Sequence, residues 1–241
     1  MKKQLVFILF MLAGILGAKA QDFKVGFQVS PSWSWMKTDE TYINPNGSLL
    51  GLKLGAVGEY YFRDNYAFTT GLGFSFNSGG KLLYDYGGRI WTRTELDPGL
   101  ETLPAGANFK YSIQYVEIPF GLKMKTREFG YVKYFAEIPV LTFGFKSQSR
   151  GTIQATGIDE TEKLNIKKEV NSIALSWGVG AGLEYSISQN TALVGGLYFQ
   201  QTFTDVTDDN GTLFNTNRGT EIANDSKGTI QSITLRLGVM F

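Results

Sequence analysis

Apolar and polar residues alternate with a period of two over most of the chain. The last ten residues, SITLRLGVMF, place Ile233, Leu235, Leu237, Val239 and Phe241 on one face of an extended strand. The same alternation recurs upstream in residues 23–36, 50–62, 66–76, 110–125, 131–146, 172–187 and 191–203. Each segment is long enough to cross a bilayer as a tilted strand, which takes ~9–11 residues. The sequence therefore predicts an all-β fold.

The connections between these segments alternate between long and short. Short turns of hairpin size are expected at residues 63–65, 126–130 and 188–190. Long polar connections are expected at residues 37–49, 77–109, 147–169 and 205–227. This order is typical of an eight-stranded antiparallel transmembrane β-barrel with short periplasmic turns and long outer loops. We assign residues 21–241 to this barrel domain.

Aromatic residues gather near both ends of the predicted strands. Tyr60, Phe62 and Tyr185 lie near the short turns, whereas Trp33 and Phe74 lie near the long loops. Amphipathic rings concentrate at the two interfaces between lipid and water, so the pattern favours a membrane barrel. The alternative is a soluble β-sandwich or lipocalin-like barrel with an aromatic core. It is disfavoured because the opposite strand faces are rich in glycine rather than in the Thr, Lys and Glu of exposed strands.

The N-terminus has the features of a secretory signal peptide over residues 1–20. Lys2 and Lys3 precede an apolar run, and Ala18 and Ala20 form an A-x-A cleavage site. We expect cleavage after Ala20 and Sec-dependent export to the cell outer membrane. The alternative is an N-terminal anchor helix, but the apolar run is shorter than the ~20 residues that a spanning helix needs.

The amino-acid composition excludes several kinds of catalytic and metal site. The chain has no His and no Cys, which excludes Ser-His and Cys-His nucleophile pairs and every metal site with a histidine ligand. The formal net charge is +1, so no strong field indicates nucleic acid as a partner. We predict no catalytic, cofactor-binding or metal-binding residues and no enzymatic activity.

Charged residues occur on the strand faces that would point into the barrel. They are Lys53, Glu59, Glu117, Lys123, Glu184 and Arg236. Charges in so narrow an interior have to be paired, so we interpret these six as a lumen charge network that fills the barrel. We expect Arg236 to pair with Glu184 or Glu117. The alternative is a narrow gated ion path.

Other motifs have structural interpretations. Pro119 and Pro139 lie inside predicted strands, and each is expected to mark a bulge or bend. The acid pairs at 159–160 and 208–209 could form a hydrolytic or Ca²⁺ site, but solvated loop charge is favoured. The long loop at 77–109 combines Trp91 with tyrosines and arginines. We expect a hairpin that extends the barrel rather than a recognition surface.

One strand resembles a known family. The stretch QYVEIPFGLKMK, residues 114–125, and the terminal aromatic strand are similar to the PorT-like outer-membrane β-barrel family of Bacteroidota. The resemblance implies a signal peptide followed by an eight-stranded barrel. The family takes its name from a protein needed for type IX secretion, although most members have no assigned activity. Phe241, the terminal aromatic, resembles the signal by which the outer-membrane assembly machinery recognises barrels.

Together these features predict a non-enzymatic integral outer-membrane protein with a structural or surface-interaction role. The alternative is a narrow pore or an accessory component of protein secretion or transport across the outer membrane. The expected partners are outer-membrane lipid, the assembly machinery, and an envelope or extracellular protein that contacts the outer loops.

Overall fold

The computed structural model describes residues 23–215 and 219–241. The predicted signal peptide and its cleavage site after Ala20 lie outside these residues. In the described part of the chain, no helix is long and apolar enough to cross a membrane.

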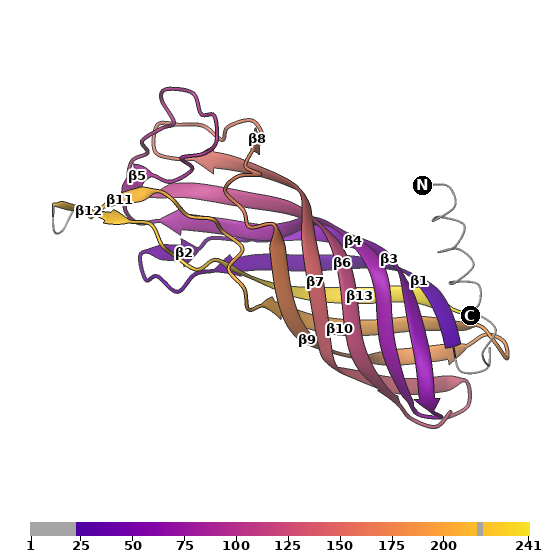
Figure 1. The fold of residues 1–241 in the computed structure, drawn as a ribbon. Coiled ribbons are helices and arrows are strands. Elements are labelled where there is room, and N and C mark those ends of the chain that lie inside the picture. The colour runs from indigo at the N-terminus through magenta and orange to yellow at the C-terminus, as the bar shows by residue number, and fades with distance from the viewer. Residues whose placement is uncertain (1–22, 216–218) are drawn as a thin grey trace, which may run out of the picture.

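Eight long strands form the body of the molecule (Figure 1). They are β1 (Phe23–Lys37), β3 (Ser48–Arg63), β4 (Tyr66–Tyr84), β6 (Ala107–Lys125), β7 (Val132–Gln154), β9 (Ile173–Ser186), β10 (Ala192–Thr202) and β13 (Thr229–Met240). Each strand pairs antiparallel with the next along the chain, and β1 also pairs with β13. The sheet therefore closes on itself, which confirms the predicted eight-stranded antiparallel barrel.

Two strands, β4 and β7, run eight residues beyond their predicted ends, and β6 begins three residues before its predicted start. The pairing of β4 with β6 continues to Tyr84 and Ala107, and that of β6 with β7 reaches Gln154. Much of the predicted loop 77–109, and the start of 147–169, is therefore strand. The tall wall that results stands at the long-loop end of the barrel (Figure 1). The expectation that the second long connection extends the barrel as a hairpin agrees with this arrangement.

The two faces of β6 exchange character along its length. Near the short turns the outward residues are apolar and the inward ones include charges, as at Phe120 and Lys123. Beyond Tyr115 the pattern reverses, so that Phe109 and Tyr111 are fully buried while Lys110 faces outward. A strand whose outward side chains are apolar is suited to lipid around the barrel. A strand whose apolar side chains point inward and whose polar side chains point outward is suited to water around it. The reversal therefore marks where β6 leaves the membrane.

Short strands in the long connections complete the outer part. They are β2 (Ile43–Pro45), β5 (Gly87–Arg89), β8 (Leu164–Asn165), β11 (Thr212–Asn215) and β12 (Thr220–Ala223). β2 pairs with β4, and β8 with β7, while β5, β11 and β12 form a separate three-stranded sheet. Beneath them lies an outer core of buried side chains that includes Tyr84, Trp91, Phe109, Tyr111, Ile153, Ile166 and Leu213.

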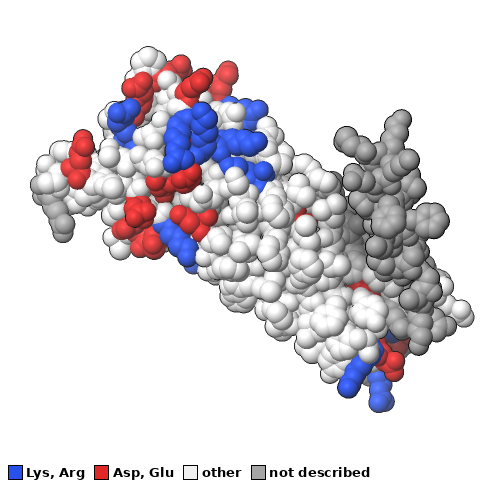
Figure 2. All heavy atoms as spheres, in the orientation of Figure 1, with Lys and Arg blue, Asp and Glu red and all other residues white. Residues whose placement is uncertain are grey.

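The middle of the barrel presents an almost uncharged surface. Figure 2 shows Lys, Arg, Asp and Glu gathered at the two ends of the molecule, with very few between them. The outward side chains in this band are large and apolar, and Phe27, Leu50, Leu72 and Leu197 are each at least half exposed. Exposed apolar area on this scale needs a lipid environment.

The two strand prolines differ in their effect. The pairings of β7 with both β6 and β9 shift by one residue between Glu137 and Val140, so Pro139 lies in a bulge as predicted. Pro119 stays in register opposite Thr142, so of the predicted bulge or bend the bulge does not occur there. The pairs between β4 and β6 are interrupted at Pro119, where the ring leaves no N–H to donate. The pairing of β6 with β7, on the other side of the strand, continues through Pro119 without interruption.

Candidate functional site

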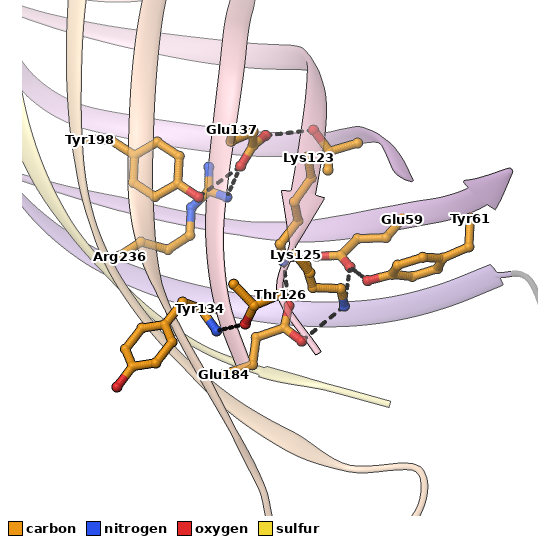
Figure 3. A network of polar contacts seen from close by, with 11 residues as sticks. Glu59, Tyr61, Lys123, Lys125, Thr126, Tyr134, Glu137, Glu184, Tyr198 and Arg236 are labelled. Carbon is orange, nitrogen blue, oxygen red and sulfur yellow. Dashed lines mark hydrogen bonds and ion pairs between the residues drawn. The ribbon is translucent and has the colours of Figure 1, made fainter. Parts of the chain in front are cut away.

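The barrel interior is filled by three layers of paired polar side chains. The layer nearest the short turns is a four-charge cluster (Figure 3). Lys123 Nζ lies 2.5 Å from both Glu59 Oε1 and Glu184 Oε1, and it is only 2% exposed. Lys125 Nζ lies 2.9 Å from Glu184 Oε2 and 3.7 Å from Glu59 Oε2. Tyr61 donates its hydroxyl to Glu59. The two cations and two carboxylates balance, which offsets their desolvation.

The middle layer centres on Glu137, which projects inward from β7 (Figure 3). Arg236 NH1 lies 3.1 Å from Glu137 Oε2, and Tyr198 donates its hydroxyl to the same oxygen at 2.7 Å. Thr69 donates to Glu137 Oε1 at 2.5 Å. The Arg236 guanidinium also stacks 3.7 Å from the Tyr198 ring centroid. Both carboxylate oxygens of this buried residue are therefore occupied.

This layer corrects the expectation for Arg236. Its partner is Glu137, not Glu184 or Glu117, because those two acids pair with lysines in the neighbouring layers. Segment 131–146 has apolar residues on both faces, so periodicity did not assign Glu137 to the lumen. A usable signal was present, since the tripeptide Glu-Ile-Pro occurs at both 117 and 137. In both copies the glutamate points inward.

The third layer lies between the middle layer and the outer core. Lys53 Nζ lies 3.0 Å from Glu117 and donates to Gln200 Oε1 at 2.9 Å. Gln200 Nε2 donates to Thr142 Oγ1 at 3.0 Å. A cavity of about 40 Å³ lies on the long-loop side and one of about 30 Å³ lies on the short-turn side. Each has room for only a few waters.

The structure places all six predicted lumen residues in ion pairs inside the barrel and adds Lys125 and Glu137. The lumen residues are Lys53, Lys123, Lys125, Arg236, Glu59, Glu117, Glu137 and Glu184. Four positive charges meet four negative ones, so the interior of the described barrel carries no net charge. Such an arrangement can order and fill the lumen, and it offers no single sign of charge that would select an ion.

The acids of the long loops differ from one another. Asp159 and Glu160 are exposed, as predicted, and Asp208 forms an exposed ion pair with Arg93 at 2.5 Å. Asp209 is not a solvated charge, because its Oδ2 accepts hydrogen bonds from Ser226 at 2.9 Å and Thr207 at 3.1 Å. In the described residues, no three acidic side chains converge as a metal site would require.

Asp209 also has an unusual acidity. The pKa of Asp209 is raised to about 7, chiefly by burial and also by the charges of Asp205 and Glu169, although the hydrogen bonds from Ser226 and Thr207 lower it. Burial also raises the pKa of Asp205 and that of Glu169. Burial therefore makes these three neighbouring residues of the outer loops weaker acids than exposed carboxyls.

We expect the outer loops to be more stable at pH 5 than at pH 8. The folded pKa of Asp209 exceeds the unfolded value of ~3.9, so the folded state binds more protons between these values and stability falls as pH rises toward 7. Hydrogen exchange of residues 205–215, corrected for intrinsic rates, measures this. Asp209→Asn should remove most of the dependence, whereas Asp208→Asn should retain it. Equal dependence in both variants would contradict the assignment.

The aromatic residues of the second long loop are largely inside the outer core. Trp91 is 3% exposed and donates its indole N–H to the Tyr111 hydroxyl at 3.0 Å. Trp91 also packs edge-to-face on Phe109. Arg93 holds the same loop against the third loop, where its backbone N–H donates to Glu169 at 2.6 Å. These side chains tie the loops together over the mouth of the barrel.

The chain is similar to several solved structures at low sequence identity. A search of curated protein sequences finds no significant match. Similar solved structures include Neisserial surface protein A, with 11% identity over 90% of this chain and 95% of that one and a TM-score of 0.44. Ail of Yersinia pestis gives 12% identity, 92% and 100% coverage and a TM-score of 0.41. OprG of Pseudomonas aeruginosa gives 14% identity, 92% and 97% coverage and a TM-score of 0.39.

The family is established by a match over most of the length. The model of the outer membrane protein beta-barrel domain matches residues 19–208, which include all or part of seven of the eight barrel strands. The almost uncharged band, the paired lumen and the closed sheet are the properties expected of such a domain. The chain belongs to the outer membrane protein beta-barrel domain family and is an outer-membrane β-barrel.

Proposed function

We propose that this protein is a non-conducting, non-enzymatic barrel whose role is carried by its extracellular part, as a surface that contacts other molecules. The observation that carries the proposal is the filled lumen. Three layers of paired side chains block the membrane-spanning section, and the outer core closes the section above it. A pore of eight strands would need a continuous water path through these layers.

The extracellular part has a hydrophobic core and a small sheet of its own, which a membrane anchor alone does not need. Its core buries Phe109, Ile153, Ile166 and Leu213, and each such side chain contributes roughly 1.5–3 kcal/mol on burial. The sheet of β5, β11 and β12 joins two connections that lie far apart in the sequence. A rigid extracellular platform presents a fixed surface, which lowers the entropic cost of binding. The proposed partners are envelope or extracellular proteins.

Planar bilayer recordings test whether the lumen is closed. We expect the purified full-length protein to insert without discrete conductance steps, because the cavities beside the Lys53–Glu117 layer hold only a few waters each. Heat-modifiable gel migration confirms insertion of the folded barrel, and a porin in the same bilayer is the positive control. Reproducible ohmic steps from the folded protein would support the narrow pore instead.

The PorT-like assignment and a role as a secretion accessory remain a second proposal. Its support is the motif strand of residues 114–125, which resembles the PorT-like family of Bacteroidota. In that motif Glu117 and Lys123 form lumen ion pairs, so barrel packing alone accounts for both. Deleting the gene should trap cargo proteins in the periplasm if the accessory role holds.

Export itself predicts a mature N-terminus at Gln21, which N-terminal sequencing measures.

A further inference from the structure

The outer wall of β6 and β7 changes from apolar to basic directly above the membrane band. The pair Val116–Phe145 is the last apolar pair that faces outward. The next outward pair is Gln114–Gln148, and beyond it Arg150 lies opposite a serine. On strands tilted by ~40°, each two-residue step rises about 5 Å along the membrane normal. Arg150 therefore lies two steps, about 10 Å, above the Val116–Phe145 pair. From there its long side chain can reach back to the lipid headgroups, which occupy the ~5–8 Å beyond the hydrocarbon.

A groove of about 540 Å³ occupies this position. Its lining includes Lys110, Arg150 and Lys163, and none of its lining residues is acidic. The hydrogen-bonding side chains of Ser112 and Gln148 lie among these cations. Figure 2 shows a dense cluster of Lys and Arg on the outer part, next to the uncharged band. The lining therefore combines three cations with polar donors, as recognition of a phosphate requires.

The backbone makes the groove concave at this level. The pairing of β4 with β6 shifts between Ser75 and Ser78, and that of β6 with β7 shifts between Gln114 and Tyr115. Asn77 lies in the first irregularity with a φ of 60°, and its Oδ1 accepts a hydrogen bond from Ser112 at 2.6 Å. Bulges bend strands and increase their twist, so two adjacent bulges form a recess on the outer wall.

The cations around the groove form no ion pairs within the described residues, although Glu160 accepts a hydrogen bond from the groove residue Thr152. Lys81 and Lys110 lie directly opposite each other on paired strands, an arrangement that repulsion disfavours. No ion pair within the described residues includes Lys81, Lys110, Arg150 or Lys163. With its amide oxygen facing the guanidinium, Gln148 accepts from Arg150 Nε at 3.0 Å, which orients that side chain. A bound anion would relieve the repulsion.

We propose that this groove binds the phosphate groups of an anionic lipid of the outer leaflet. Arg150 supplies a planar fork for one phosphate, while Lys110 and Lys163 neutralise the remaining charge. Phe76 lines the same groove at the top of the apolar band and is 37% exposed, so acyl chains can pack directly below the bound headgroup. This continuity favours a lipid over free phosphate. The site lies on the outside of the barrel and does not depend on whether the lumen conducts.

Native mass spectrometry of the full-length barrel in detergent tests the site with bisphosphorylated lipid A as the probe. Loss of one cation beside an anionic headgroup costs roughly a factor of five, so Arg150→Gln should weaken lipid binding about fivefold and the triple variant Lys110→Gln, Arg150→Gln, Lys163→Gln about a hundredfold. The matched control removes three exposed cations elsewhere, by Lys37→Gln, Lys168→Gln and Lys227→Gln, and should bind as the wild type does.

Three outcomes would overturn the proposal. Equal binding by the wild type and the triple variant would show that these cations do not hold the lipid. Equal binding of dephosphorylated lipid A would show that the acyl chains alone account for affinity. Displacement of the lipid by inorganic phosphate at similar concentration would assign the groove to a free anion. Heat-modifiable migration confirms that each variant is folded, since all three replaced side chains lie on the surface of the outer wall.

Discussion

Replacing Glu137 by leucine is expected to destabilise the barrel by about 3–5 kcal/mol, the usual cost of removing one partner from a buried ion pair. Glu137 is 1% exposed and accepts from Arg236, Tyr198 and Thr69. Leucine cannot accept from any of them, so a buried guanidinium and two hydroxyls lose their partner. Urea-induced unfolding in lipid vesicles, followed by heat-modifiable migration, measures the change.

Two further variants separate this effect from the loss of any ion pair. Glu128→Leu removes a carboxylate that lies 3.2 Å from Lys133 in the exposed short turn, and it should leave the stability of the barrel nearly unchanged. The double variant Glu137→Leu with Arg236→Met removes both buried charges and should recover much of the lost stability. A cost for Glu137→Leu no greater than that for Glu128→Leu would show that the middle layer contributes little.

The membrane-spanning section was predictable because lipid imposes one simple rule. Outward positions such as Leu197 and Leu237 must be apolar along the whole crossing, so a period of two appears directly in the sequence. Short turns then fix which strands are neighbours. The same rule places Lys53 and Glu184 inside, since charge on the lipid face is costly. Whether a side chain of the membrane-spanning section faces lipid or the lumen could therefore be predicted from the type of residue and its place in the alternation.

Pairing inside the lumen could not be read in this way. Arg236 on β13 meets Glu137 on β7, although these strands are not adjacent in the sheet. Which residues meet across the barrel depends on strand tilt and stagger, and the bulge at Pro139 shifts one of the strands by a residue. Periodicity carries no information on stagger. The contact therefore appeared only in three dimensions.

The core and the short strands of the extracellular part were not predicted, for a different reason. Above the membrane the apolar residues of β6 move to the inner face, so Phe109 and Tyr111 no longer continue the outward apolar row. The sheet of β5, β11 and β12 joins residues more than a hundred positions apart, as in the pair Gly88–Leu213. Short strands of three or four residues have too little periodicity to identify them from sequence.

Deleting Phe241 is expected to reduce the amount of protein in the outer membrane sharply. The residue completes the seam of the barrel, since its N–H donates to the Val25 carbonyl at 2.8 Å and its carbonyl accepts from the Val25 N–H at 3.3 Å. Two such hydrogen bonds contribute only about 1 kcal/mol each. Its ring is 55% exposed on the lipid-facing side, where a recognition machinery could reach it. We therefore predict a defect of assembly larger than any loss of stability.

Phe241→Ala separates these two contributions, because it keeps both backbone hydrogen bonds and removes only the ring. If the ring is the assembly signal, this variant should refold in detergent nearly as the wild type does, yet be scarce in outer-membrane fractions. Phe27→Ala is the matched control, since Phe27 is an outward phenylalanine of β1 with 64% exposure and no terminal position. Normal membrane levels of Phe241→Ala, or an equal fall for Phe27→Ala, would mean that the ring acts only as lipid-facing surface.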